Sequence, residues 1–458
     1  MKVIYIDIDS LRPDHLHCYG YKRPTSPNID RLAMQSMRFT QCYTSDSPCM
    51  PSRAALISGT FGIRTGIVTH GITGLAMPLH TRTIPAVLRE HGVRTAAFST
   101  FGRHPSPWFY MEWEEFHDPR GWRFQQTPAW KMNEQVLPWI EANAQDDFFL
   151  YVQYWDPHAI YDAPQALVNA MSEHDLPSFP DEEAIARHQN DRFWHSASMM
   201  GIHSYGEYAA MVNEYDAEIR YADFHVGQIL NLLERKGILD ETMIIIAADH
   251  GEGLGEHGVY VEHWSIVDTV NHIPLIVKFP RGVGAGRTCQ ALVYQFDIAA
   301  TICEAFQIAK PIEWDSESLW PYTDEKNVMG RSHLVIGHGL YTAQRGVVTD
   351  RWKFIRTLHS GEWNYPDQQL FNRESDVYEQ TNVFAKHQDI VKSLNGYLVD
   401  WEYQNRVTLG YDPLVATAHQ GPPGLHLYGK ETMEDFYVRG IPQRVTYSER
   451  KPDIPVLE

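Results

Sequence analysis

The side chain with the most reactive chemistry in this sequence is Cys49, in the stretch Cys49-Met50-Pro51-Ser52-Arg53. Proline is favoured in the first turn of a helix, so Pro51 predicts that a short helix starts here and ends near Gly59. Cys49 would then lie where unpaired backbone N–H groups and the helix dipole favour an anion, and Arg53 can grip that anion through two N–H groups. Considered alone, the stretch better fits a half-buried thiol beside an arginine in a surface ion pair.

Acidic residues follow two apolar, strand-like runs that lie far apart in the chain. Asp7 and Asp9 end the first run, and Asp249 and His250 follow the second, at 243–248. A single strand-end aspartate is more often a turn or cap residue, but two such ends with a histidine favour a metal. In an open α/β sheet, ligands bind beyond the carboxyl ends of strands, so these residues and Cys49 predict one metal-assisted anion site.

The ligand types leave the metal open among a few divalent ions. Carboxylate oxygens suit a hard cation, and we favour Ca²⁺ on that ground. The imidazole of His250 is instead compatible with Mn²⁺ or Zn²⁺.

The elements that must position these residues alternate between strands and helices up to residue 310. Strands are expected at 3–7, 94–98, 148–153, 243–248 and 275–279, and helices at 28–37, 83–91, 129–142 and 213–236. Such alternation predicts a doubly wound, mostly parallel α/β sheet. We therefore expect a catalytic α/β domain over residues 1–310.

The pattern changes in the last third of the chain. Closely spaced short strands are expected at 334–337, 342–349 and 353–357, followed by a helix at 390–405. They predict a smaller α+β subdomain over residues 311–458 that carries an antiparallel sheet. The tail after Gly410 lacks periodicity, so we expect it to wrap the surface or to contact a partner subunit in a homo-oligomer.

Composition excludes several classes of function. The formal net charge is −19 and the sequence shows no basic stripe, which excludes nucleic acid as a partner. No apolar run reaches the roughly 18 residues of a membrane span, and Asp7 and Asp9 interrupt the N-terminal run, so neither a membrane protein nor a signal peptide is expected. The five cysteines are few, odd in number and not in metal-ligand spacing. They indicate a reducing compartment, and we expect a cytoplasmic protein.

Three stretches together resemble the successive signatures of the formylglycine-dependent (type I) sulfatases, which belong to the alkaline phosphatase superfamily. They are Asp7-Ile8-Asp9-Ser10-Leu11-Arg12, the cysteine stretch continued through Gly59, and Asp249-His250-Gly251-Glu252. The resemblance extends to residue 382, because the segment 370–382 is similar to a C-terminal stretch of the family. It implies an alkaline phosphatase-like fold, sulfuric ester hydrolysis, and a metal ion bound by Asp7, Asp9, Cys49, Asp249 and His250.

The resemblance also implies that Cys49 is oxidised after synthesis to formylglycine. A formylglycine-generating enzyme or an anaerobic sulfatase-maturing enzyme would be needed as a partner. The aldehyde hydrates to a geminal diol: one oxygen binds the metal and attacks sulfur, and the second hydroxyl lets the covalent sulfate ester collapse back to the aldehyde. A thiol cannot perform that second step.

Further site residues are carried over from the resemblance. Arg103 and His104 stand where the family has a Lys-x-His pair, so His104 is expected to be catalytic and Arg103 to bind substrate. His158 resembles a Pro-His histidine that reaches the ester oxygen, and we expect it to protonate the leaving alcohol. Glu262 takes the place of a sulfate-binding lysine of many members, and His263 is the expected substitute.

The leading interpretation is hydrolysis of a sulfate monoester, or a sulfamate, of a small sugar-like or aryl alcohol. Some aromatic residues are expected either to stack a sugar ring or to belong to the core. They are Trp108, Trp122, Trp155 and Tyr161. One alternative is a phosphonate monoester or phosphodiester hydrolase, because relatives with the same cysteine motif cleave phosphorus esters. Another is a catalytically inactive anion-binding protein, against which the complete set of motif residues argues.

Overall fold

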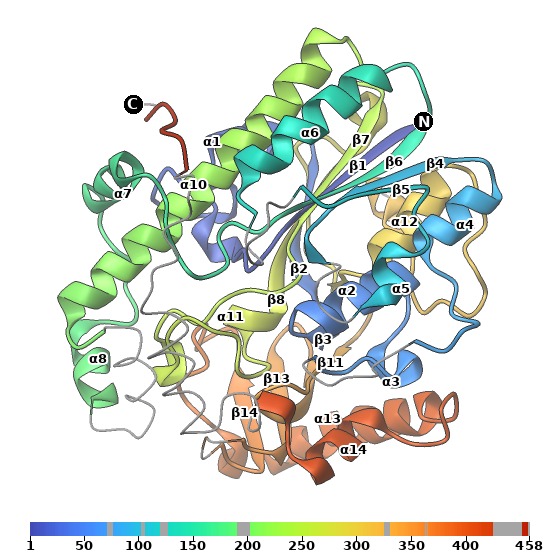
Figure 1. The fold of residues 1–458 in the computed structure, drawn as a ribbon. Coiled ribbons are helices and arrows are strands. Elements are labelled where there is room, and N and C mark those ends of the chain that lie inside the picture. The colour runs from blue at the N-terminus through green and yellow to red at the C-terminus, as the bar shows by residue number, and fades with distance from the viewer. Residues whose placement is uncertain are drawn as a thin grey trace.

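A computed structural model describes residues 1–70, 77–101, 106–119, 127–189, 202–324, 330–361, 363, 365–424 and 451–456. It contains a large mixed sheet with helices on both faces and a second, smaller sheet (Figure 1). None of the helices in these ranges combines the length and apolarity needed to cross a membrane.

The large sheet places two parallel strands with acidic ends side by side at its centre. Its strand order is β10-β2-β8-β7-β1-β6-β4-β5, and β9 pairs with β2. The strands are β1 (Lys2–Ile8), β2 (Met37–Tyr43), β4 (Arg94–Phe98), β5 (Glu115–His117), β6 (Phe148–Tyr154), β7 (Thr242–Ala247), β8 (His272–Lys278), β9 (Thr288–Cys289) and β10 (Val293–Tyr294). β8 runs antiparallel to both its neighbours, and the other pairs are parallel.

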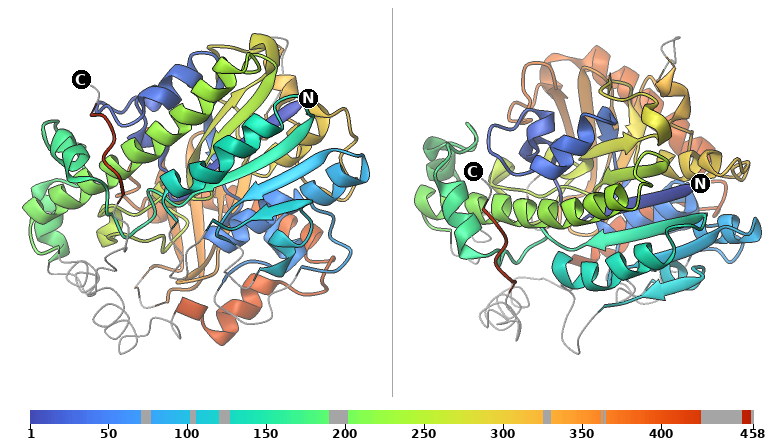
Figure 2. Two further views of the ribbon diagram at one scale, coloured as in Figure 1. Left: turned by 45° about the horizontal axis from the view of Figure 1, so that its top comes forward. Right: turned by 90° about the horizontal axis from the view of Figure 1, so that it is seen from above.

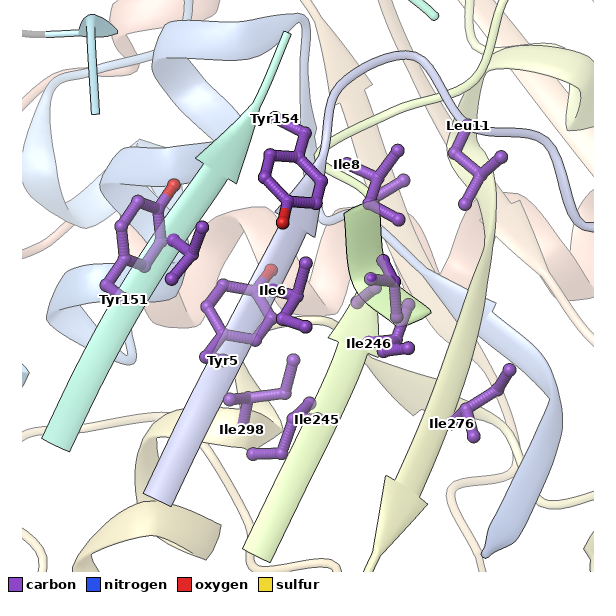
Figure 3. Close-up of a cluster of buried hydrophobic side chains, with 14 of the residues drawn as sticks. Tyr5, Ile6, Ile8, Leu11, Tyr151, Tyr154, Ile245, Ile246, Ile276 and Ile298 are labelled. Carbon is purple, nitrogen blue, oxygen red and sulfur yellow. The ribbon is translucent and has the colours of Figure 1, made fainter. Parts of the chain in front are cut away.

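The central strands are apolar on both faces because helices cover both sides. Ile6 on β1 is in register with Ile246 on β7, and each has 0% of its surface exposed. Figure 3 shows these side chains with Tyr5 and Tyr151, packed across adjacent strands. Strands buried on both faces read as continuous apolar runs rather than as an alternation, which is why β6 and β7 could be recognised in the sequence.

The helices form two groups. One group is α1 (Pro27–Ala33), α6 (Ala129–Ala142) and α10 (Tyr205–Arg235), and the other is α2 (Cys49–Ser58), α4 (Ile84–Glu90) and α12 (Asp297–Ala305). Figure 2 shows the two groups on either side of the sheet. The shorter helices are α3 (Gly62–Thr65), α5 (Pro107–Tyr110), α7 (Gln165–Ser172), α8 (Glu182–His188) and α11 (Asp268–Asn271).

The second sheet helps to place the cysteine helix. Its order is β14-β13-β12-β11-β3, from β14 (Gln368–Asn372), β13 (Trp352–His359), β12 (Ala343–Val348), β11 (Leu334–His338) and β3 (Asp46–Ser47). The first four are antiparallel, whereas β3 is parallel to β11. Because β3 ends directly before α2, this sheet holds the chain that leads into Cys49. Two helices lie against it, α13 (Gln388–Asn405) and α14 (Pro413–Gln420).

The predicted fold class is confirmed, and β4 and α6 have the predicted bounds. The prediction of a helix over 28–37 is wrong at its end: α1 stops at Ala33 and Met37 opens β2. In β2 the buried residues Met37 and Phe39 alternate with half-buried ones, which is a strand period that the helix interpretation overlooked. The tail after Gly410 contains α14, which the sequence pattern did not indicate. The division into domains at residue 310 stays a prediction.

Candidate active site

Three carboxylates meet at the carboxyl ends of the two central parallel strands. Asp7 lies at the end of β1, in register with Ala247 of β7, and Asp9 follows β1 directly. Asp249 stands two residues beyond β7. All three side chains have 0% exposure. The backbone N–H groups of Ser10 and His250 donate to Asp249 Oδ1 over 3.2 and 2.9 Å, which orients this carboxylate.

Cys49 faces these carboxylates from the first turn of α2. The helix ends at Gly59, as predicted, with φ of 58°, and a Cβ there would come within 2.8 Å of Trp314. Cys49 Sγ lies 3.0 Å from His250 Nε2, which is 3.4 Å from Asp249 Oδ2 and 4.0 Å from Asp9 Oδ1. The ligand atoms of Asp9, Cys49, Asp249 and His250 all lie within 4.8 Å of one another. Four residues from three separate segments therefore converge on one point.

Protonation at this point suits ligand binding rather than thiolate chemistry. Burial lowers the pKa of His250 to about 4, so the imidazole is neutral near pH 7. His250 Nδ1 is 2.8 Å from the carbonyl oxygen of Gly251, which leaves Nε2 as the free ligand atom. Burial, Asp9 and Asp249 raise the pKa of the Cys49 thiol well above its ordinary value. These surroundings do not activate Cys49 as a thiolate nucleophile.

Arg53 lies among the three carboxylates. Its guanidinium is fully buried and bonds to all three carboxylates: Nε to Asp7 Oδ2 at 2.8 Å, one terminal nitrogen to Asp9 Oδ2 at 2.9 Å, and the other to Asp249 Oδ2 at 2.7 Å. It therefore holds the carboxylates together, a role that the sequence did not predict, and its contact with a bound anion stays a prediction. The alternative of a surface ion pair is wrong.

The carboxylates outnumber the cation, and this excess is what a divalent ion would balance. One guanidinium faces three buried acids, and Asp7 Oδ1 is buried without a hydrogen-bond partner. Burial raises the pKa of Asp7 and Asp249 despite the charge of Arg53. At Asp9 burial acts in the same direction, but Arg53 and the neighbouring histidines outweigh it and lower the pKa. The donor set thus fits a divalent cation, with Asp9, Asp249 and His250 converging directly and Asp7 behind them.

Two further predicted histidines lie at the edge of this cluster. The ring centroid of His263 is 4.3 Å from that of His250 and 6.2 Å from that of His158. Burial and then His250 lower the pKa of His263 to about 3, so it offers a hydrogen bond rather than a positive charge. Burial alone would lower the pKa of His158, but Asp9 and Glu252 outweigh it and raise the pKa. His158 Nδ1 is 2.6 Å from the carbonyl oxygen of Ala159, and its ring packs against Trp155.

Three residues predicted to lie at the site stay predictions. Arg103, His104 and Trp122 lie outside the described residues. Of the other aromatic residues, Trp108 packs against Phe101, and Tyr161 packs against Tyr215. Phe101 and Tyr215 belong to the apolar core, and Trp108 and Tyr161 are partly buried against it.

The sequence reasoning missed residues that complete the cluster. The hydroxyl of Tyr151 on β6 donates to Asp7 Oδ2, and no sequence signal marks it except its place in a buried strand. Ser10 adopts φ of 59° and its hydroxyl donates to Asp9 Oδ1 over 3.2 Å. Glu252 is 1% exposed, with Oε1 3.9 Å from His263 Nδ1. It belongs to the Asp-His-Gly-Glu stretch at 249–252, but the sequence predicted no role for it.

Comparisons with known proteins identify the family. A family model described as Sulfatase matches residues 2–308, and one described as N-sulphoglucosamine sulphohydrolase, C-terminal, matches residues 255–404. An N-acetylglucosamine-6-O-sulfatase of Bacteroides thetaiotaomicron is 22% identical, over 84% of this chain and 82% of that protein.

Solved structures share the fold. One, in complex with its substrate D-glucosamine-2-N,6-O-disulfate, aligns with a TM-score of 0.72 at 19% identity and covers 90% of this chain and 99% of its own. The phosphonate monoester hydrolase of Agrobacterium radiobacter aligns with a TM-score of 0.74 at 18% identity and covers 88% and 96%.

Fold and site together define a member of the alkaline phosphatase superfamily. Within it, the chain belongs to the sulfatase family, whose model spans residues 2–308. It is a sulfuric ester hydrolase, and metal binding and formylglycine are typical of that family.

Proposed function

We propose that this chain hydrolyses the sulfate ester, or the sulfamate, of a small sugar, with Cys49 converted to formylglycine and one divalent metal ion at the carboxylate cluster. The observation that carries the proposal is the convergence of the ligand atoms of Asp9, Cys49, Asp249 and His250 within 4.8 Å. The sugar is supported by the relative that acts on N-acetylglucosamine-6-O-sulfate, as its name states, and by the match to the sulphohydrolase C-terminal model.

The groups that the family implies would be held by residues already in place. Asp9, Asp249 and His250, with Asp7 behind them, would hold the metal, for which Ca²⁺ is favoured and Mn²⁺ or Zn²⁺ remain alternatives. When bound, the metal ion supplies charge stabilisation and the formylglycine supplies a hydrated aldehyde as nucleophile. Arg53 orients the three carboxylates through its bonds to each of them.

His158 is the proposed general acid. Its Nδ1 is occupied by the Ala159 carbonyl oxygen, so Nε2 is the atom that can carry a proton to the leaving alcohol. The nearby charges of Asp9 and Glu252 favour the protonated imidazole. His263, held neutral, is proposed to donate or accept a hydrogen bond at the sulfate oxygens.

The proposal is tested by comparing kcat/KM for matched aryl sulfate, phosphate monoester and phosphonate monoester substrates. The protein is co-expressed with a formylglycine-generating enzyme, and the mass of the peptide that contains residue 49 is measured first. We expect a higher kcat/KM for the aryl sulfate than for either phosphorus ester. We also expect kcat/KM for sulfated glucosamines to exceed that for the aryl sulfate. The proposal would be overturned if fully matured protein turned over no sulfate, or if its kcat/KM for the sulfates were no higher than that for the phosphorus esters.

The second candidate is hydrolysis of a phosphonate monoester or phosphodiester. The observation that favours it is the imidazole of His250 in the ligand set, 3.0 Å from Cys49 Sγ. A higher kcat/KM for either phosphorus ester in the same experiment would establish this candidate instead.

We also propose a cytoplasmic location. All five cysteines are free, which supports a reducing compartment. Fractionation of the native host, with the activity recovered outside the cytoplasm, would contradict it.

A further inference from the structure

A buried lysine near the C-terminus is ion-paired with three carboxylates around the segment that carries His158. Lys451 Nζ lies 2.7 Å from Asp156 Oδ1, 2.5 Å from Asp162 Oδ1 and 2.6 Å from Glu218 Oε2. The side chain of Lys451 is 6% exposed, and those of Asp156 and Glu218 are 5% and 1% exposed. Its ammonium also lies 5.4 Å from the ring centroid of Tyr221. Figure 2 shows the segment 451–456, in dark red, alongside α10, which carries Glu218.

Two of the three carboxylates, Asp156 and Asp162, lie at the two ends of one short segment, residues 155–162, which we call the His158 loop. The third, Glu218, lies on α10. Asp156 precedes His158 by two residues and Asp162 follows it by four. Asp156 Oδ2 also accepts from the backbone N–H of Ala129, at the start of α6, over 2.7 Å. Glu218 Oε1 accepts from the backbone N–H of Asp162 over 2.6 Å. The loop is thus tied to α6 and α10, and a single ammonium joins both of its ends.

Removal of that ammonium would leave three carboxylates facing one another, and two of them, Asp156 and Glu218, have little access to water. Like charges in such a place repel one another strongly, and a buried charge without its partner is costly. Movement of the loop ends toward solvent relieves the repulsion, and so does protonation of Glu218, whose pKa burial raises to about 8 even with Lys451 in place. In either case the two ends of the loop are no longer held together through a shared ammonium. His158 lies between these ends, so its ring would lose its fixed position beside His263.

We infer that Lys451 is a positioning residue for the reaction: by joining Asp156, Asp162 and Glu218, it fixes the His158 loop so that His158 can protonate the leaving alcohol. The inference rests on the proposed function, in which His158 is the general acid. It assigns a role in the active site to a residue about 290 positions away in the sequence, on a segment that no active-site motif marks.

The experiment measures kcat/KM for a series of aryl sulfates whose leaving phenols differ in pKa. The 4-nitrophenolate ion is a weak base and leaves without much help from an acid. The unsubstituted phenolate is a stronger base and leaves readily only when it is protonated.

We expect Lys451→Met to lower kcat/KM by less than about 3-fold for the nitrophenyl ester and by about 30- to 100-fold for the phenyl ester. This loss is at or below the lower end of the roughly 10²- to 10⁴-fold contribution of general acid catalysis, because the variant misplaces the acid without removing it. In His158→Gln the loss of kcat/KM should rise more steeply with the pKa of the leaving phenol than it does in Lys451→Met. Lys451→Arg, which keeps the charge, should recover part of the loss.

Controls separate positioning from general damage. Lys353 is a matched buried lysine in the second sheet, 2.6 Å from Asp268 and 3.0 Å from Glu379, and neither of these partners belongs to the His158 loop. Lys353→Met should reduce stability without steepening the dependence on the leaving group. Asp162, which is 33% exposed, provides a milder change, because Asp162→Asn keeps Lys451 paired with the other two acids. Should Lys451→Met fail to fold, Asp162→Asn must show the same dependence in weaker form.

A second readout does not depend on activity. Amide hydrogen exchange in the peptide that covers residues 155–162 should become faster in Lys451→Met and stay unchanged in Lys353→Met. Unchanged exchange in Lys451→Met, or losses of kcat/KM that are equal for all leaving groups while His158→Gln remains steep, would overturn the inference and leave the proposed function standing. A flat response of His158→Gln would instead remove the general acid from the proposed function, and the inference with it.

Discussion

Two buried clusters of charge in this molecule differ in their balance. Beside the second sheet, the carboxylates of Asp268 and Glu379 face two cations, Lys353 of β13 and Arg373. At the ends of β1 and β7, three carboxylates face a single cation among the described residues, Arg53. The first cluster is neutral and needs no further ion, whereas the second carries an excess of negative charge. We call the neutral cluster around Lys353 the closed cluster and the negatively charged cluster around Arg53 the open cluster. The closed cluster connects elements of the fold, whereas the open cluster is suited to bind a cation and to carry out catalysis.

The largest difference between the two clusters should appear when the nucleophile is removed from the open cluster, because this change should affect activity and not stability. Cys49→Ala should abolish turnover of aryl sulfates, by at least about 10⁴-fold in kcat, because no other described side chain takes that place at the start of α2. The fold should be retained, since alanine fits the helix and only one sulfur atom is lost. Steady-state kinetics and circular dichroism check both points. Residual activity that exceeds this limit in purified variant would contradict the assignment of Cys49.

The corresponding change in the closed cluster should have the opposite profile. Lys353→Met leaves Asp268 and Glu379 short of a partner and should destabilise the fold by about 3–5 kcal/mol, measured by denaturant unfolding. The kcat of the remaining folded enzyme should equal that of the wild type. A loss of kcat without a loss of stability would mean that the comparison between the clusters is wrong.

Metal removal tests the open cluster without reference to activity. Treatment of Cys49→Ala protein with a chelator should lower its stability, and adding back Ca²⁺ at about 100 times its Kd should restore about 3 kcal/mol. Thermal melts in Ca²⁺, Mn²⁺ and Zn²⁺ would also rank the metals. The double variant Asp9→Asn, Asp249→Asn is the control and should not respond. A melting temperature that no divalent ion changes would argue against a metal at this cluster.

A buried base away from both clusters sharpens the comparison through pH. Burial lowers the pKa of His225 to about 4, and its Nδ1 is 3.0 Å from Gln228 Oε1. The unfolded chain, with a histidine pKa near 6.5, binds the proton first as pH falls, so stability is lost between about pH 6.5 and pH 4. The share of His225 is at most about 3 kcal/mol across that window.

His225→Gln should therefore show a shallower loss of stability between pH 6.5 and pH 4 than the wild type. Urea unfolding at several pH values measures the slope. Parallel curves for the two proteins would show that His225 titrates normally in the folded state. Above pH 7 the two curves should be parallel, because the histidine is neutral in both states.

Several parts of this molecule were determined by the sequence alone. The apolar run of β7 and the bounded pattern of α6 are local signals, and each element formed where predicted. The stretch around Cys49 and the acidic ends of two strands also predicted that these side chains would converge, because parallel strands of one sheet end at the same edge.

Only the tertiary structure decided which groups each charge would meet. Arg53 binds the carboxylates, since Asp7, Asp9 and Asp249 surround it from two strands. Tyr151 reaches Asp7 because β6 pairs with β1 in a register that no local pattern specifies. Lys451 meets the His158 loop although the two lie far apart in the sequence. Local propensity and periodicity act over a few residues, whereas buried ion pairs depend on how distant segments pack, and that is settled only when the chain folds.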